Sequence, residues 1–342
     1  MNNQIIKKQA LKLNSPQRRV LINAFSALAA GVAAGGSRQG VAQAVYPNKS
    51  VKFIVPYPAG GFPDTVARIV SNQLAKRIGV GVVVDNKPGA NGVVAAQALA
   101  SSPADGYSFL VTDGSMFSIN PLIYKTLSYD PKKDFSPVSP LARAPLFWAV
   151  NTKTPANTIQ EFIALAKAKP GELNYGSSGI GSTHHLAVEA MKNILGLDIV
   201  HIPFKGMGQA VPALVGGQVN ALFSAYPALA GFVKSGQVKL IAVNSIKRSE
   251  LFPNAPAISE FIPGYDFAPT VGLLAASATP RDLITKMNAE ITAVMKLPET
   301  IETMKTAGIE ALNGSSVDYT NMIQAESDRM VKAVSLAAIK PE

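Results

Sequence analysis

Short β-rich runs alternate with helical segments along most of this chain, and the alternation begins twice. The first series comprises predicted strands at 51–55, 80–85 and 109–112, with helices between them that end near Ile78 and Ala100. Asp64 is expected to N-cap the first of these helices. Strands and helices that alternate through short loops predict α/β units around a mostly parallel sheet.

The second series predicts a second lobe. Its expected strands are 146–150, 173–176, 199–202, 219–223 and 239–243, and its expected helices are 158–169, 183–195 and 211–215. Three further helices are expected at 283–295, 299–307 and 318–333. We therefore assign 45–147 and 270–342 to lobe 1 and 148–269 to lobe 2. The Pro-rich segments 131–145 and 253–269 are the expected crossings between the lobes.

The N-terminal segment has the pattern of an export signal. Basic residues precede an apolar run at 20–34, and the small-residue pattern Ala42-Gln43-Ala44 follows it. The apolar run is about fifteen residues long, whereas a spanning helix needs roughly twenty, so a membrane anchor is the weaker alternative. We expect cleavage after Ala44 and a periplasmic mature protein. The pair Arg18-Arg19 leaves both Sec and twin-arginine export open.

Charge and cysteine content exclude several classes of function. The chain has a formal net charge of +10, but residues 1–44 contain six Lys or Arg and no Asp or Glu, so +4 remains without them. No basic run is left that could follow a nucleic-acid backbone, and no nucleic-acid partner is expected. The chain contains no cysteine. Disulfides, thiolate catalysis, cysteine-based zinc sites and lipid attachment at cysteine are therefore excluded.

Two loops share one design. YPAGGFPD at 57–64 and GSSGIGST at 176–183 each connect a predicted strand to the start of a helix. Free N–H groups at a helix start favour an anion, and glycines allow its close approach. Each loop alone fits a simple tight turn with a capped helix equally well. One such loop in each lobe favours a carboxylate held between the lobes.

Residue types suited to catalysis or metal binding are sparse. Ser177 and Ser178 lie in the sequence GSSGI, which lacks the final glycine of a nucleophile elbow. An exported serine hydrolase is therefore a distant alternative. His184 and His185 point in different directions on a predicted helix, and His201 stands alone in a β-run. We expect no catalytic residue, no metal and no cofactor.

Several motifs in order along the chain resemble one known family. They are YPNKSV at 46–51, IVPYPAGG at 54–61, VVVDNKPGANG at 82–92, DGY at 105–107, HIPFKG at 201–206, LVGGQV at 214–219 and LIAV at 240–243. Together they resemble the Bug (TctC-like) family, the periplasmic solute receptors of tripartite tricarboxylate transporters. The resemblance implies a two-lobed Venus-flytrap fold of type II-like α/β architecture. It also implies capture of a small carboxylate without catalysis.

The resemblance also implies ligand contacts in both lobes. In the first lobe they would fall on Ala59, Gly60, Gly61, Phe62 and Asp64, and after the third strand on Thr112, Asp113 and Ser115. In the second lobe they would fall on Ser177, Ser178, Gly179, Thr183 and His184, on Lys205 and Gly206, and on a loop of Ser224, Ala225 and Tyr226. Lys205 would supply positive charge to the anion, although a solvated lysine fits the sequence almost as well.

Phe62 and Pro63 occupy positions at which this family varies. Phe62 would stack on an aromatic ring or simply fill its loop, so we favour an aromatic mono- or dicarboxylate such as terephthalate. The alternatives are an aliphatic di- or tricarboxylate of the citrate type and a periplasmic sensing receptor. The resemblance implies delivery to the integral membrane subunits of a tripartite carboxylate transporter. We expect a monomer.

Overall fold

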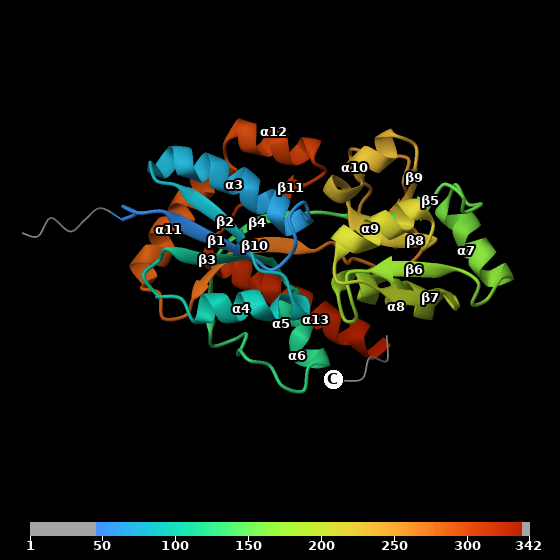
Figure 1. The fold of residues 1–342 in the computed structure, drawn as a ribbon, viewed down its shortest axis with the longest axis horizontal. Helices are drawn as coiled ribbons and strands as arrows, with labels where there is room; N and C mark the ends of the chain where they lie inside the picture. The colour runs from blue at the N-terminus through green and yellow to red at the C-terminus, as the bar shows by residue number, and fades with distance from the viewer. Residues whose placement is uncertain (1–45, 337–342) are drawn as a thin grey trace, which may run out of the picture. The chain divides into compact units, whose positions relative to one another are not determined.

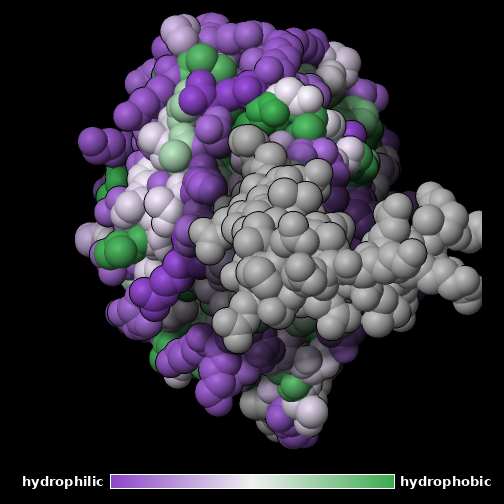
Figure 2. All heavy atoms as spheres, turned by 90° about the vertical axis from the view of Figure 1, so that its left-hand side faces the viewer, coloured by the Kyte–Doolittle hydropathy of each residue, from purple (hydrophilic) through white to green (hydrophobic). Residues whose placement is uncertain are grey.

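The computed structural model describes residues 46–336. The predicted signal, its cleavage after Ala44 and its twin-arginine pair lie outside the described residues. Within the described range, no helix combines the length and the apolar character that a membrane span requires. Hydrophilic residues predominate on the coloured surface in Figure 2, and the hydrophobic ones form separate small spots. Isolated exposed hydrophobic residues are normal on proteins in contact with water.

The first lobe is built on a six-stranded sheet in the order β11-β4-β10-β3-β1-β2 (Figure 1). Its strands are β1 (Val51–Val55), β2 (Val82–Asn86), β3 (Ser108–Asp113), β4 (Phe135–Arg143), β10 (Thr270–Ala276) and β11 (Glu310–Ala311). Its helices are α3 (Phe62–Ile78), α4 (Val93–Ala100), α5 (Ser115–Ser118), α6 (Asn120–Ile123), α11 (Arg281–Met295), α12 (Pro298–Thr306) and α13 (Ser316–Leu336), with a 3-10 turn η1 (Ala90–Gly92). Helices α3, α11 and α12 pack on one side of the sheet, and α4, α5 and α13 on the other.

The second lobe is built on a five-stranded sheet in the order β7-β6-β8-β5-β9. Its strands are β5 (Leu146–Asn151), β6 (Asn174–Ser177), β7 (Val200–Pro203), β8 (Ala221–Ala225) and β9 (Val238–Val243). Its helices are α7 (Ile159–Ala168), α8 (Thr183–Leu195), α9 (Met207–Gly216) and α10 (Tyr226–Lys234), with a 3-10 turn η2 (Ile258–Glu260). Phe147 and Ala149 face α9 and α10, while Trp148 packs on Phe162 of α7.

The predicted two-lobed α/β class is confirmed, but the sheets are mixed rather than mostly parallel. Strand β1 pairs in parallel with β2 and β3, and β6 pairs in parallel with β7 and β8. Strand β10 runs antiparallel to both neighbours, and so does β5. Strand β5 is the first strand of the second sheet after the chain leaves the first lobe, and β10 is the first strand of the first sheet after the chain returns. The direction of entry explains their orientation, which strand propensities alone do not reveal.

The two crossings lie side by side. The backbone N–H of Ala144 donates to the carbonyl of Pro269 at 3.3 Å. Strand β5 belongs to the second sheet from Leu146 onward, so the expected boundary at 147/148 falls inside a strand. We propose that the lobes divide at Pro145 and at Pro269. The segment expected only as a crossing, 131–145, holds the nine-residue strand β4.

Gly272 in the middle of β10 makes room for an aromatic ring. A Cβ atom at this position would overlap the ring of Tyr319 from α13. Tyr319 is 1 % exposed and belongs to the core cluster that also contains Leu110 and Leu274. Close packing of α13 on the sheet therefore depends on the absence of a side chain at Gly272, because a packed core cannot absorb an added group without strain.

We predict that Gly272→Ala lowers the free energy of unfolding by about 1–3 kcal/mol or more. Gly231→Ala is the matched control, because a Cβ there meets nothing within 4 Å and the residue lies inside helix α10. The free energy of unfolding of this control should rise by roughly 0.5–1 kcal/mol, because alanine is more stable than glycine in a helix interior. Urea unfolding of both variants measures the difference. Equal stability of Gly272→Ala and the parent would contradict this packing.

Candidate functional site

A cavity of about 260 Å³ lies between the two sheets and is lined by both lobes. The predicted contact residues that line it are Ala59, Gly60, Gly61, Phe62, Asp113, Ser178, Thr183, His184, Ser224 and Ala225. The structure therefore brings the two glycine-containing loops together. A larger cavity of about 650 Å³ lies in the second lobe near Asn157 and Phe252, and neither loop contributes to it.

Four helices begin at this cavity. Helix α3 starts after Gly61, α8 after Ser182, α9 after Gly206 and α10 after Ala225. Each helix start carries the equivalent of about half a positive charge, because its first N–H groups have no partner within the helix. Among residues 46–336, no Lys or Arg lines the cavity. Positive potential in the cavity therefore comes from the backbone, which suits a small anion.

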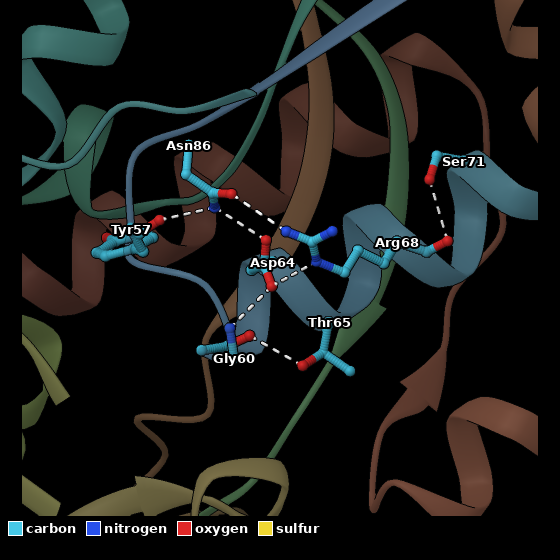
Figure 3. Close-up of polar contacts among 8 residues, drawn as sticks. Tyr57, Gly60, Asp64, Thr65, Arg68, Ser71 and Asn86 are labelled. Atoms are coloured by element: carbon cyan, nitrogen blue, oxygen red, sulfur yellow. Dashed lines mark hydrogen bonds and ion pairs between the residues drawn. The ribbon is translucent and has the colours of Figure 1, made fainter. Parts of the chain in front are cut away.

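The first-lobe loop is braced by Asp64 (Figure 3). Its carboxylate accepts hydrogen bonds from the Gly60 N–H at 2.8 Å, from Arg68 Nε at 2.9 Å and from Asn86 Nδ2 at 2.9 Å. Burial alone would raise the pKa of Asp64, but these bonds from Arg68, Gly60 and Asn86 hold it below its usual value. Asp64 is thus an ionised brace that shapes the loop from behind.

Two expectations for this loop are corrected. The N-cap of α3 is Gly61, and Asp64 lies in the first turn of the helix, because the helix already begins at Phe62. Gly60 and Gly61 line the cavity, but their N–H groups are bonded within the loop, to Asp64 and to the carbonyl of Pro58 at 3.4 Å. The free donors of this loop are the first N–H groups of α3, on Phe62 and Asp64.

The second-lobe loop has a free donor of a different kind. Ser182 caps α8 by accepting the His185 N–H, and the Gly181 N–H donates to His185 Nδ1 at 3.1 Å. Thr183 is only 3 % exposed and lines the cavity, yet its hydroxyl has no hydrogen-bond partner within residues 46–336. A buried polar group without a partner is costly, so this hydroxyl requires an explanation.

His184 stands beside Thr183 in the first turn of α8. Its Nδ1 lies 2.9 Å from the Ser178 hydroxyl. Burial lowers the pKa of His184 to about 4, so the ring is neutral at pH 7. When Ser178 donates to Nδ1, the proton of the neutral ring resides on Nε2. His184 then offers one further donor without adding charge.

The other two histidines support this loop from behind. The rings of His185 and His201 stack with centroids 4.0 Å apart, and Tyr175 stacks on His201 at 4.9 Å. His201 Nε2 lies 2.7 Å from the Ser177 hydroxyl. Ser177 is fully buried and does not line the cavity. Its role in the structure is to hold the loop, because its hydroxyl also accepts the Gly179 N–H at 3.1 Å.

Neither serine–histidine pair forms a complete catalytic triad. No carboxylate in the described part of the chain is hydrogen-bonded to His184 or to His201, so neither ring has the acidic partner of a catalytic triad. Nor do residues 46–336 contain a group of three or more His, Cys, Asp or Glu side chains placed to hold a metal ion.

Asp113 is the one acidic residue in the described range that lines the cavity. It accepts hydrogen bonds from the Tyr57 hydroxyl at 2.9 Å and from the Ser115 N–H at 3.0 Å. Burial raises the pKa of Asp113 despite these bonds. Thr112 and Asp113 are the last two residues of β3 rather than residues after it, and Thr112 and Ser115 lie outside the cavity lining.

Four further expected contacts do not line this cavity: Gly179, Lys205, Gly206 and Tyr226. Gly179 and Lys205 line a neighbouring cavity of about 330 Å³, which shares Ser178 with the first. Gly206 faces Pro58, whose Cγ lies 3.6 Å from an ideal Cβ built on the glycine. Ser224 and Ala225 belong to β8, and Tyr226 begins α10 directly. The expected loop of these three residues is therefore absent, because the strand passes straight into a helix.

Many residues of the cavity wall were not predicted from the sequence. The lining residues that sequence reasoning did not assign are Tyr57, Pro58, Pro63, Leu146, Met207, Gly208, Val211, Pro212, Ala228, Phe232 and Pro269. Most are apolar, and several come from α9 and α10. Their signal is weak because α9 was expected only over 211–215 and α10 not at all. Both helices contain proline, Pro212 and Pro227.

A second buried carboxyl lies behind Asp113. Glu326 of α13 is 2 % exposed, and its carboxyl occupies the space that a side chain at Gly114 would need. Burial and then the charge of Asp113 raise the pKa of Glu326 to about 8. In the unfolded chain the group ionises near 4.5. Between these two values the folded protein binds more protons at this site than the unfolded chain does.

We therefore predict that the contribution of Glu326 to the free energy of unfolding falls as the pH rises from about 5 to 8, since each pKa unit is worth ~1.4 kcal/mol. Glu326→Gln removes this dependence and retains a neutral side chain of the same shape. The buried histidines contribute in the opposite sense, but equally in both proteins. Subtracting the variant's free energy of unfolding from the parent's at each pH therefore cancels their contribution. Urea unfolding at several pH values tests the difference. Parallel curves for the parent and Glu326→Gln would show that Glu326 does not titrate there.

Comparison with known proteins agrees with this geometry. Residues 66–337 match the family model described as tripartite tricarboxylate transporter family receptor. BugT of Bordetella pertussis is 32% identical over 279 residues, which cover 81% of this chain and 86% of BugT. An R. palustris protein solved with adipate is 32% identical, with a TM-score of 0.84 over 87% of this chain and all of that one. The periplasmic binding protein BugD is 28% identical, with a TM-score of 0.81 over 87% of this chain and all of BugD.

The family match covers most of the chain, and the relatives align over nearly their whole length. The chain belongs to the Bug (TctC-like) family of tripartite tricarboxylate transporter receptors, which are periplasmic solute-binding proteins.

Proposed function

We propose that this protein captures a small organic carboxylate between its lobes and delivers it to the integral membrane subunits of a tripartite carboxylate transporter. The observation that carries the proposal is that four helices start at one cavity, to which the described part of the chain contributes no Lys or Arg side chain. Backbone donors fixed by helices bind a carboxylate without needing to be ordered on binding. The protein acts as an exported, monomeric receptor and not as an enzyme.

The favoured ligand is an aromatic acid with one or two carboxylates, of which terephthalate is an example. Phe62 supports this choice, because it lines the cavity beside the apolar Pro63 and is only 7 % exposed. Aromatic rings pair with one another in offset or edge-to-face geometry. A cavity of about 260 Å³ lies just below the range of roughly 300–1,000 Å³ typical of drug-sized ligands. A small acid therefore fits its volume.

An aliphatic dicarboxylate is the second candidate. The R. palustris relative described above was solved with adipate at 32% identity. Both candidates carry a carboxylate; they differ in whether the rest of the molecule is an aromatic ring or an aliphatic chain.

A thermal-shift screen of the mature protein against aromatic, aliphatic and citrate-type acids tests the proposal. A ligand that binds only the folded state at 100 times its Kd adds about 2.7 kcal/mol of stability, which raises Tm by several degrees. We expect this rise with at least one carboxylate and none with its uncharged amide. If no carboxylate raises Tm, the proposed function is wrong.

Gly61→Val tests the position of the site. Gly61 has an ordinary extended backbone (φ −73°, ψ 169°), and an added Cβ would lie 3.5 Å from the nearest atom, the Pro58 carbonyl oxygen. The variant should therefore fold normally, while its isopropyl group occupies part of the cavity. We predict at least a tenfold loss of carboxylate affinity in calorimetry with little change in the Tm of the free protein. Unchanged affinity would place the ligand elsewhere.

A further inference from the structure

An acidic side chain lines a cavity whose helix starts suit an anion. Asp113 is 8 % exposed and faces this cavity from the first lobe. Every hydrogen bond that its carboxyl accepts within residues 46–336 comes from a neutral group of Tyr57 or Ser115. An ionised Asp113 would repel an anionic ligand, because like charges at close range disfavour each other. Binding of an anion therefore requires this repulsion to be relieved.

Glu326 lies directly behind Asp113, inside the first lobe. Its carboxyl occupies the space that a side chain at Gly114 would need, and Gly114 follows Asp113 in the chain. Glu326 is 2 % exposed and does not line the cavity. The charges of both carboxyls act on Tyr57 and on Tyr319, so these side chains form one buried cluster. We call the two carboxyls of this cluster the acid pair.

No cation of the described residues forms an ion pair with the acid pair. Arg143 and Arg329 lower the pKa of Glu326 through their charges alone, and Arg143 is paired with Asp266. Glu326 accepts the Thr270 N–H, but its Oε1 has no hydrogen-bond partner in the described range. Two ionised carboxylates buried without a counter-ion are strongly unfavourable, so the acid pair retains a proton.

The pKa shifts agree with one retained proton. Burial raises the pKa of both carboxyls, and the charge of Asp113 contributes to raising that of Glu326 to about 8. Carboxyls that interact in this way titrate as a pair. An anion in the cavity favours the state in which the proton resides on Asp113, the member that lines the cavity. The negative charge of the pair then lies on Glu326, behind the wall.

We propose that Asp113 and Glu326 form a proton-binding site coupled to the ligand site, so that the anion binds while the pair holds a proton and binds weakly once the proton is lost. This inference rests on the proposed function and adds the proton as a second ligand. Glu326 is a positioning residue, because it acts through Asp113. Coupling between two ligands is reciprocal, so binding of the anion also draws a proton onto a deprotonated pair.

Calorimetry at pH 8.5 in two buffers of different ionisation enthalpy counts the protons taken up. The probe is the acid that raises Tm most among benzoate, terephthalate, adipate and citrate. We expect uptake of about half a proton per ligand, and a Kd that rises about three- to tenfold from pH 7 to pH 9. The three histidines are neutral throughout this range, because burial lowers the pKa of each. Burial raises the pKa of Tyr57 and Tyr319, so both remain protonated.

Two variants separate this coupling from a structural role. Glu326→Gln retains the shape but cannot share a proton, so Asp113 ionises at lower pH, the loss of affinity begins below pH 7 and the proton uptake at pH 8.5 disappears. Asp113→Asn makes the wall neutral and should bind the probe at pH 9 at least threefold more tightly than the parent. Asp328→Asn is the control, because it removes an exposed charge from the same helix and should keep the parent's pH profile.

The outcomes distinguish the inference from the proposed function. If the probe binds without proton uptake and with equal affinity at pH 7 and pH 9, the inference is wrong while the proposed function stands. Identical pH profiles for the parent and Glu326→Gln would also overturn it, as would a loss of affinity in both pair variants that is the same at every pH. If none of the four acids binds, the inference fails together with the proposed function.

Discussion

The unpaired N–H groups at the starts of α3, α8, α9 and α10 are the constraint on which the rest of this structure depends. Strands that end at the same edge of a sheet, followed by short loops, place helix starts together at that edge. Each sheet contributes such an edge, and the cavity lies between them. Positive potential arises although no cationic side chain of residues 46–336 lines the cavity, so its walls remain available for apolar contacts. The fold itself thus provides the electrostatics of the site.

Each glycine-containing loop is held by a polar group behind it. In the first lobe the group is Asp64, which bonds the loop, its own helix through Arg68 and the neighbouring strand through Asn86. In the second lobe it is the stacked pair His185 and His201. Loops fixed in this way lose little freedom when a ligand binds, which favours affinity. The same bonds occupy donors that a loop motif alone would assign to the ligand.

The sequence predicted local features well and long-range ones poorly. Strand β1 was predicted with its exact bounds because a β-rich run ends at Pro56. Strand β4 was missed because Pro137 and Pro140 interrupt its pattern, and its pairing with β10 contains register shifts around them. Proline is tolerated in such irregular pairings because a ladder N–H is not required at every position.

In the site, too, local features were predicted from the sequence and long-range ones were not. Ten of the expected contacts line the cavity, since glycines and hydroxyls at a helix start are a local signal. The apolar wall was not assigned, because Met207, Val211 and Phe232 look like ordinary core residues until α9 and α10 are placed over the second sheet. The engagement of the Gly60 N–H by Asp64 was also hidden, because a carboxylate near a helix start in sequence is equally able to cap it.

The adjacent crossings have a mechanical consequence. The bond from Ala144 to Pro269 ties the two connecting strands together, so any separation of the lobes would bend both strands as one joint. Leu146 and Pro269 lie at this joint and also form part of the cavity wall. Rotation about the joint displaces nearby atoms least and distant atoms most. The cavity would therefore open from its far rim, and its floor would stay in place through each cycle of loading and release.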